Sequence, residues 1–246
     1  MPNLETEKTY GLFANPQNIR LITQLKQKGT NLLILPLIGT EAVKLDGNSN
    51  DMLRNVQQFD WLILTDVFAA EYFIEALREL GVDFFELDNL TVCAFGEAAA
   101  DRLRFVQVQA DVIPSKIDDE TIYATISQFV GGDFADLRFL MINEISAKSD
   151  LTEKLKNRAA TVAEVAIYQA NVENSSELIR LKTLLENGAV DEFIFSAAED
   201  LAGLKLLFAE NDLKRILSES TVAAVSEIVY QSLQELGLHP KYFHLK

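Results

Sequence analysis

At four places the sequence sets a hydroxyl, a glycine or a carboxylate directly after a short apolar segment and before a helical one. In parallel sheets, ligands bind beyond the carboxyl ends of the strands, where the first N–H groups of the next helix are unpaired and attract anions. The sequence therefore predicts binding positions at eight residues. They are Thr65, Asp66, Gly96, Glu97, Ser196, Ala197, Ser226 and Glu227.

Thr65 and Ser196 each carry a hydroxyl that can donate a hydrogen bond to an anion. The same hydroxyl is typical of a plain N-cap, which would give these residues a structural role alone. Gly96 allows a ligand to approach the backbone closely, or it allows a tight turn between strand and helix. The matched placement of Thr65 and Ser196 in two parts of the chain gives a shared ligand role the same weight as the N-cap role, and both alternatives stay open.

The sequence contains an internal repeat. Residues 59–73 resemble residues 190–204, an offset of 190 − 59 = 131 positions. Residues 91–103 resemble residues 221–233, an offset of 221 − 91 = 130 positions. Because both segments recur in the same order at nearly the same offset, we expect two similar α/β domains rather than one long sheet.

Short apolar segments alternate with helical patterns along the chain, which predicts parallel sheets covered by helices. The predicted strands are residues 11–14, 32–35, 61–64, 91–95, 137–142, 163–167, 192–195, 221–225 and 242–245. The predicted helices are residues 16–28, 69–80, 97–105, 118–130, 149–158, 176–186, 198–209 and 227–236. Residues 46–50 (DGNSN) predict a loop, and Gly29, Gly81 and Gly237 are expected to end helices.

Composition excludes several classes of function. The 246 residues include 22 basic and 37 acidic side chains, a net charge of −15, so nucleic acids and anionic membranes are not expected partners. One cysteine, Cys93, and two histidines argue against a disulfide or a Cys/His-rich metal site. The first ten residues lack the apolar core of a signal peptide, and residues 32–38, the longest apolar run, are too short to span a membrane. We expect a cytoplasmic protein.

The order of these segments resembles the uroporphyrinogen-III synthase family over nearly the whole chain. The repeated pattern of aspartate, apolar run, Thr or Ser, helix, strand and helix is similar to that family. So are three further segments, which are residues 11–16 (GLFANP), 35–38 (LPLI) and 163–170 (AEVAIYQA). Each motif is degenerate, so the specificity of the resemblance lies in the order of the motifs.

The resemblance implies two parallel-sheet α/β domains flanked by helices, joined by a two-stranded ladder, with a cleft between them. Residues 1–37 and 170–246 would form one discontinuous domain, and residues 38–169 the other. The cleft would hold the linear tetrapyrrole hydroxymethylbilane, without a metal or an organic cofactor. The family expectation is a monomer.

In this family the protein acts as a cyclising hydro-lyase of haem biosynthesis, which removes the hydroxymethyl oxygen as water, inverts ring D and closes the macrocycle. The resemblance places Tyr168 in the role of general acid for the departing oxygen. The alternative for Tyr168 is an aromatic side chain packed in the ladder with a solvated hydroxyl.

The chain departs from the family pattern where basic residues and threonines are expected. The opening Thr-Arg-Pro is Ala14-Asn15-Pro16, which makes Asn15 a binding candidate without the arginine. The helix-start Gly-x-x-Thr becomes Gly96-Glu97-Ala98-Ala99, which adds Ala98 to the binding candidates. Arg20 and Lys148 are candidate counter-charges for substrate carboxylates.

These departures leave two functions open. The first is an active, diverged uroporphyrinogen-III synthase. The alternative is a protein of the family fold that has lost catalysis and acts as a binding or scaffold module. A two-domain solute-binding protein is a more remote third possibility.

Overall fold

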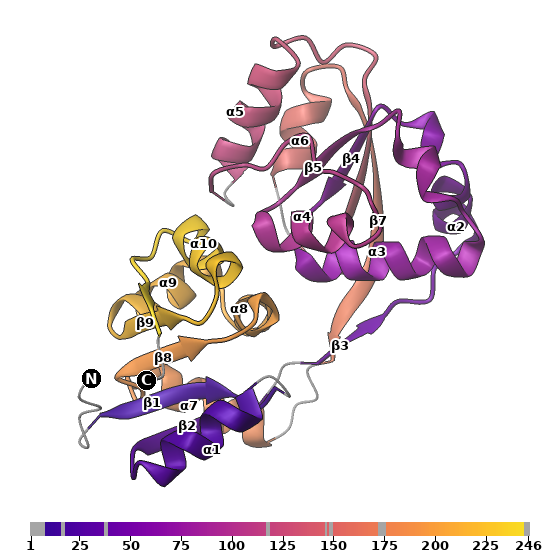
Figure 1. Cartoon of the computed structure of the whole chain (residues 1–246). Helices are drawn as coiled ribbons and strands as arrows, with labels where there is room; N and C mark the ends of the chain where they lie inside the picture. The colour runs from indigo at the N-terminus through magenta and orange to yellow at the C-terminus, as the bar shows by residue number, and fades with distance from the viewer. Residues whose placement is uncertain are drawn as a thin grey trace. The chain divides into compact units, whose positions relative to one another are not determined.

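A computed structural model describes residues 8–15, 18–36, 39–116, 119–145, 147, 150–171 and 176–243. The chain divides into two compact units (Figure 1). Unit 1 comprises Met1–Gly39 with Ala170–Lys246, and unit 2 comprises Thr40–Gln169. Each unit is built on one five-stranded sheet. The predicted fold class, two helix-flanked parallel sheets, is confirmed.

The sheet of unit 1 has the strand order β10-β9-β8-β1-β2, and its neighbouring strands run parallel. Parallel strands need crossover connections, which here are helices. The strands are β1 (Thr9–Phe13), β2 (Asn31–Leu35), β8 (Glu192–Phe195), β9 (Thr221–Ala224) and β10 (Lys241–Tyr242). The helices are α1 (Ile19–Gln27), α7 (Ser176–Glu186), α8 (Ala198–Leu207), α9 (Glu210–Ser218) and α10 (Glu227–Glu235).

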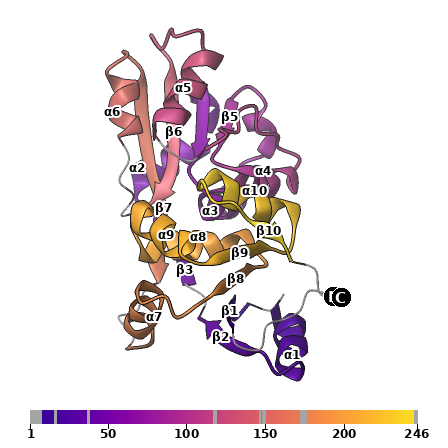
Figure 2. The ribbon, with the colours of Figure 1, turned by 90° about the vertical axis from the view of Figure 1, so that its left-hand side faces the viewer.

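Helices cover both faces of this sheet (Figure 2). Phe193 and Phe195 of β8 belong to a core that also takes in apolar residues of α7, α8, α9 and α10. Ile194, which lies between them, points to the opposite face and packs in a second core with Leu25 of α1. Alternate residues of one strand are therefore buried on opposite faces, which explains the continuous apolar run.

The sheet of unit 2 has the strand order β3-β7-β6-β4-β5. Its strands are β3 (Gly39–Ala42), β4 (Trp61–Leu64), β5 (Thr91–Ala94), β6 (Arg138–Glu144) and β7 (Thr161–Asn171). Its helices are α2 (Gly47–Arg54), α3 (Val67–Leu80), α4 (Glu97–Arg104), α5 (Asp119–Phe129) and α6 (Leu151–Lys156), with 3₁₀ turns at Val56–Gln58 and Phe84–Leu87. Trp61 and Ile63 pack with apolar residues of α5 and α6, so the alternate residues Leu62 and Leu64 face the other side of the sheet.

The internal repeat is visible in the topology of the two units. The neighbouring strands β9-β8-β1-β2 of unit 1 correspond to β5-β4-β6-β7 of unit 2. Two aspartates that match in the repeat make the same contact. Asp60 Oδ2 accepts from the N–H of Arg138 at 2.8 Å, and Asp191 Oδ2 accepts from the N–H of Thr9 at 2.8 Å. Each aspartate directly precedes a central strand and binds the first residue of the neighbouring strand.

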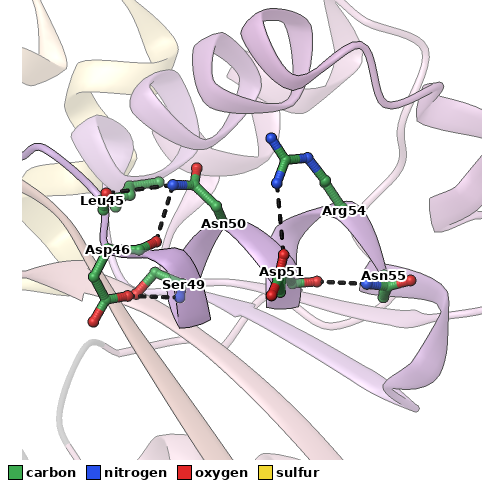
Figure 3. Close-up of polar contacts among 7 residues, drawn as sticks. All are labelled: Leu45, Asp46, Ser49, Asn50, Asp51, Arg54 and Asn55. Carbon is green, nitrogen blue, oxygen red and sulfur yellow. Dashed lines mark hydrogen bonds and ion pairs between the residues drawn. The ribbon is translucent and has the colours of Figure 1, made fainter.

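The loop predicted at residues 46–50 is wrong, because these residues form the start of helix α2. Asp46 is the N-cap, and its Oδ1 accepts from the N–H of Ser49 at 2.7 Å (Figure 3). That bond lowers the pKa of Asp46. The side chain of Asn50 donates to the carbonyls of Leu45 and Asp46. Asp, Asn and Ser bond to nearby backbone in loops and in helix caps alike, so composition alone did not separate the two.

Other differences concern the ends of elements. The strand predicted at residues 163–167 is the eleven-residue β7, and β3 and α9 were not predicted. The predicted helix starts at Pro16, Asp118 and Ser149 and the strand end at residues 244–245 lie outside the described residues. The expected helix ends are confirmed, because Gly29, Gly81 and Gly237 have φ values of 72°, 68° and 83°. In the part of the chain that the structure describes, we find no helix with the length and apolar character of a membrane span.

We predict that Asp60→Ala and Asp191→Ala each lower the free energy of unfolding by about 1 kcal/mol, because each removes the acceptor that joins two strands. Asp60→Asn and Asp191→Asn should retain most of the stability, since an amide oxygen still accepts. Urea unfolding measures the difference. Asp88→Ala, at an exposed aspartate of unit 2, is the control. Equal unfolding midpoints for Asp60→Ala, Asp88→Ala and the unchanged chain would contradict a stabilising role for the Asp60–Arg138 hydrogen bond.

Candidate functional site

The predicted site residues fall into two groups, one at the carboxyl ends of the strands in each unit. Unit 2 holds Thr65, Asp66, Gly96, Glu97, Ala98 and Tyr168. Unit 1 holds Asn15, Ser196, Ala197, Ser226 and Glu227. Lys148 lies outside the described residues.

Tyr168 lies on β7 and its hydroxyl donates a hydrogen bond of 2.6 Å to Asp66 Oδ2. The side chain is 1% exposed. Its ring stacks on Tyr72 with a centroid distance of 5.5 Å, and it also contacts the ring of Phe68 at 5.7 Å. Tyr72 in turn shares a hydrogen bond of 3.1 Å with Thr40. The hydroxyl is therefore bound to a carboxylate in a buried position. The structural alternative expected a solvated hydroxyl, which differs from this arrangement.

Asp66 connects this tyrosine to the start of α3. It is the N-cap residue, and its Oδ1 accepts from the N–H of Ala69 at 2.7 Å. One carboxylate oxygen thus caps the helix while the other accepts from Tyr168. Burial, the charge of Asp66 and the nearby Glu144 raise the pKa of Tyr168 well above its usual range. The phenol therefore keeps its proton at neutral pH.

An irregularity in the sheet sets Glu144 beside Tyr168. Along β6 and β7 the register is regular up to Asn143 and Ala166, and it then shifts so that Glu144 pairs with Tyr168. Such a shift re-aims side chains at the end of a strand. The N–H of Ile145 donates to the carbonyl of Tyr168 at 3.0 Å, which fixes the chain directly after the shift.

The start of α4 is the second feature of unit 2. Gly96 is the N-cap with φ 91° and ψ 159°, a conformation that favours glycine, and no side chain caps the helix. The N–H of Phe95 donates to the carbonyl of Leu64, which sets this turn next to the end of β4. Glu97, in the first turn, pairs with Arg104 at 2.9 Å. The α4 N-terminus is thus an anion-attracting end beside Thr65 and Asp66.

The N-cap alternative for the two hydroxyls is wrong, because neither Thr65 nor Ser196 is an N-cap. Thr65 Oγ1 donates to the carbonyl of Ile142 at 3.0 Å, and Asp66 caps α3. In unit 1 the N-cap position of α8 belongs to Ala197. Ser196 Oγ donates to Asp200 Oδ2 at 3.2 Å. The matched hydroxyls therefore have different partners.

Asp200, which the sequence analysis missed, organises the group in unit 1. It is 1% exposed and accepts at Oδ1 from the side-chain amide of Asn15 at 2.8 Å. Its Oδ2 accepts from the N–H groups of Ser196 at 3.2 Å and Ala197 at 3.1 Å. Asn15 also donates to Ser196 Oγ at 3.0 Å. The amides predicted to bind a ligand anion are already bonded to an internal carboxylate.

The repeat offers one signal for the position of this acid. Asp200 aligns with Ala69, the residue whose N–H is capped by Asp66, while Ala197 aligns with Asp66 itself at the same offset of 131. The acid has therefore moved from the N-cap to the third helical position. Burial raises the pKa of Asp200, and the hydrogen bonds from Asn15, Ser196 and Ala197 oppose that effect in part.

Ser226 and Glu227 begin α10. Ser226 is the N-cap and accepts from the N–H of Val229 at 3.4 Å. Glu227 accepts from Gln231 at 3.1 Å and from the hydroxyl of Tyr242. Tyr242 is 43% exposed, and its ring stacks on Tyr230 with a centroid distance of 4.5 Å. The acid at this helix start is therefore held by its own neighbours.

The fold and these residues define a two-unit α/β protein with polar groups at the carboxyl ends of both parallel sheets. The family model of uroporphyrinogen-III synthase HemD matches residues 19–244. The chain belongs to this family, which confirms the resemblance found in the sequence.

Solved structures share the fold of this chain, and a curated relative is similar to it in sequence. Wild-type uroporphyrinogen III synthase of Thermus thermophilus is 21% identical, with a TM-score of 0.62 over 95% of this chain and 91% of that chain. A mutant of the same enzyme is 20% identical, with a TM-score of 0.62 over 94% of this chain and 90% of that chain. The porphyrin biosynthesis protein HemD of Ruminiclostridium josui is 21% identical over 183 residues, 74% of this chain and 36% of that protein. The chain thus spans about a third of the length of this curated relative.

We predict that Asp200→Ala lowers the free energy of unfolding by about 1–3 kcal/mol, because the buried amide of Asn15 and the half-buried N–H groups of Ser196 and Ala197 lose their acceptor. The folded chain holds the Asp200 proton more tightly than the unfolded chain, since the pKa is raised above 3.8. The stabilisation that comes from this tighter proton binding is complete below pH 3.8. It is lost as the pH rises through the pKa of Asp200 in the folded chain. The stability difference between the unchanged chain and Asp200→Ala should therefore widen as the pH is lowered.

Urea unfolding at several pH values, from neutral down to mildly acidic, measures this difference. Glu199→Ala, in the same turn of α8, is the control for loss of one acid at this helix start. A difference that narrows towards acid pH would contradict the raised pKa of Asp200.

Proposed function

We propose that this chain is a uroporphyrinogen-III synthase, which dehydrates and cyclises hydroxymethylbilane with inversion of ring D. The observation that carries the proposal is the buried Tyr168–Asp66 pair beside the uncapped start of α4. It supplies a proton donor and an anion-attracting helix end at one edge of one sheet. Membership of the family supplies the substrate.

The proposed role of Tyr168 is to give its proton to the departing hydroxymethyl oxygen. The C–O bond breaks, the oxygen leaves as water, and the pyrrole nitrogen stabilises the cation that forms. The substituted α-carbon of ring D then attacks this cation, and its bond to the methylene bridge of ring C breaks, which leaves a second cation on that bridge. The free α-carbon of ring D attacks the second cation and loses its proton, which returns to the phenolate. The reaction releases one water and consumes no net proton, so no cofactor is needed in the scheme.

The raised pKa of Tyr168 has two consequences for this role. It keeps the phenol protonated, which a general acid requires before each turnover. It also makes a tyrosinate next to Asp66 costly, so proton transfer and C–O cleavage should occur together. Because Tyr168 is 1% exposed in the free chain, substrate binding must open access to its hydroxyl.

An assay with freshly made hydroxymethylbilane tests the function. We expect uroporphyrinogen III as the product, and we propose a cofactor-free monomer that works in the cytoplasm. The isomers are separated after oxidation to the porphyrins. Formation of uroporphyrinogen I alone, at the spontaneous rate, would contradict the proposal and would favour the binding or scaffold module instead.

We predict that Tyr168→Phe lowers kcat by about 10²-fold, the low end for the loss of a general acid. Far-ultraviolet circular dichroism should be unchanged, because the ring still packs against Tyr72 and Phe68. The matched control is Tyr123→Phe, which removes a hydroxyl bonded to Arg158 on another part of unit 2. Unchanged turnover by Tyr168→Phe would assign the hydroxyl to structure.

A further inference from the structure

Unit 1 contains a hollow of about 350 Å³ near the group around Asp200. It lies where the start of α1 approaches the ends of β8 and β9, and Ser196 forms part of its wall. This volume is at the lower end of ligand pockets, so it fits one part of a large substrate rather than a chain of four rings.

The polar wall of the hollow is formed by α1. Arg20 and Gln24 lie four residues apart and therefore on the same helix face. Arg20 is exposed, and within the described residues its guanidinium forms no ion pair or side-chain hydrogen bond. None of the described residues that line the hollow is acidic, although the chain carries a net charge of −15. An unpaired arginine in this setting favours an anionic ligand.

Part of the lining is apolar. It consists of Leu21 of α1 together with Val225 and Phe243. Val225 is 44% exposed, and the N–H of Phe243 donates to the carbonyl of Ala224 at 2.8 Å, which holds Phe243 directly after β10. An apolar wall with one guanidinium at its edge suits a flat ring that carries a carboxylate arm.

Asn18 provides a second, independent observation. It lines the hollow and is 0% exposed, and its side-chain amide donates to the carbonyl of Phe13 at 2.8 Å. Its Oδ1 has no hydrogen-bond partner. A buried acceptor of this kind calls for a donor. This Oδ1 is buried behind the wall and is not itself open to the hollow, so the partner that the hollow lacks is an anion for Arg20, which a carboxylate arm on a pyrrole ring supplies.

We propose that this hollow binds one carboxylate-bearing pyrrole ring of the substrate, with Arg20 paired to the carboxylate. The identity of the ring rests on the proposed function. Arg20 would then supply the positive charge that Asn15 does not, from a position five residues further along the chain. The internal carboxylate of Asp200 holds the neighbouring amides of Ser196 and Ala197, so a guanidinium is needed here to hold an anion.

Direct binding is measured with porphobilinogen, a single pyrrole that carries one acetate and one propionate arm. Titration into the ¹⁵N-labelled chain should shift the amide signals of Arg20, Gln24 and Val225. Arg20→Gln should weaken this binding about 10-fold, the expected loss of one charge-assisted pair. Arg20→Lys should restore part of the affinity, and added salt should reduce the difference. Lys26→Gln, on the same helix but not in the hollow, removes the same charge and should bind as the unchanged chain does.

Turnover of hydroxymethylbilane provides the second measurement. Arg20→Gln should raise KM about 10-fold with little change in kcat, because Arg20 binds the substrate but does not touch the reacting atoms. The inference is overturned if porphobilinogen shifts no amide at the hollow, or if Arg20→Gln and Lys26→Gln bind it equally. If the unchanged chain makes only uroporphyrinogen I while porphobilinogen still binds in an Arg20-dependent way, the proposed function fails and the carboxylate site stands.

Discussion

Both units are governed by one electrostatic constraint: a parallel sheet brings several helix N-termini to one edge, and their N–H groups must be satisfied. In unit 2, Asp66 caps α3 and uses its second oxygen to hold Tyr168. In unit 1, Asp200 accepts hydrogen bonds from the backbone N–H groups before α8 and from the side-chain amide of Asn15. The chain fills these positions with its own carboxylates, so a ligand must find its partners elsewhere at the same edge.

The two acids have different consequences for function because they sit at different positions in the repeat. At the N-cap, Asp66 has one carboxylate oxygen left to accept from the hydroxyl of Tyr168, and the phenol of Tyr168 stays protonated. At the third helical position, Asp200 is wholly engaged by Ser196, Ala197 and Asn15. The proposed chemistry therefore lies with unit 2, whereas Arg20, whose guanidinium has no ion pair among the described residues, gives unit 1 its proposed role in holding the substrate.

Much of the fold could be predicted from sequence because it rests on the alternation of short apolar strands and amphipathic helices. Asp60 and Asp191 lie 131 positions apart, the offset of the repeat, and the structure shows that both make the same strand-to-strand bond. The start of α2 was missed because Asp46 and Ser49 have the same local chemistry in a loop and in a helix cap.

The site was less accessible from sequence. Strand ends could be located, but the partner of each polar group depends on contacts between residues far apart in the chain. Asn15 and Asp200 are 185 positions apart, and Asp66 and Tyr168 are 102 apart. Local patterns carry no information on such pairs, so the occupied amides of Ser196 and Ala197 could not be foreseen. Only the alignment of Asp200 with Ala69 in the repeat offered a signal.

The central claim is that Tyr168, held by Asp66, supplies the proton for ring closure. The most direct measurement is the ratio of type III to type I porphyrin formed from hydroxymethylbilane, compared between the unchanged chain and Tyr168→Phe at equal protein concentration. The account predicts mostly type III from the unchanged chain and a strong shift to type I from the variant. The same ratio from both proteins would contradict it.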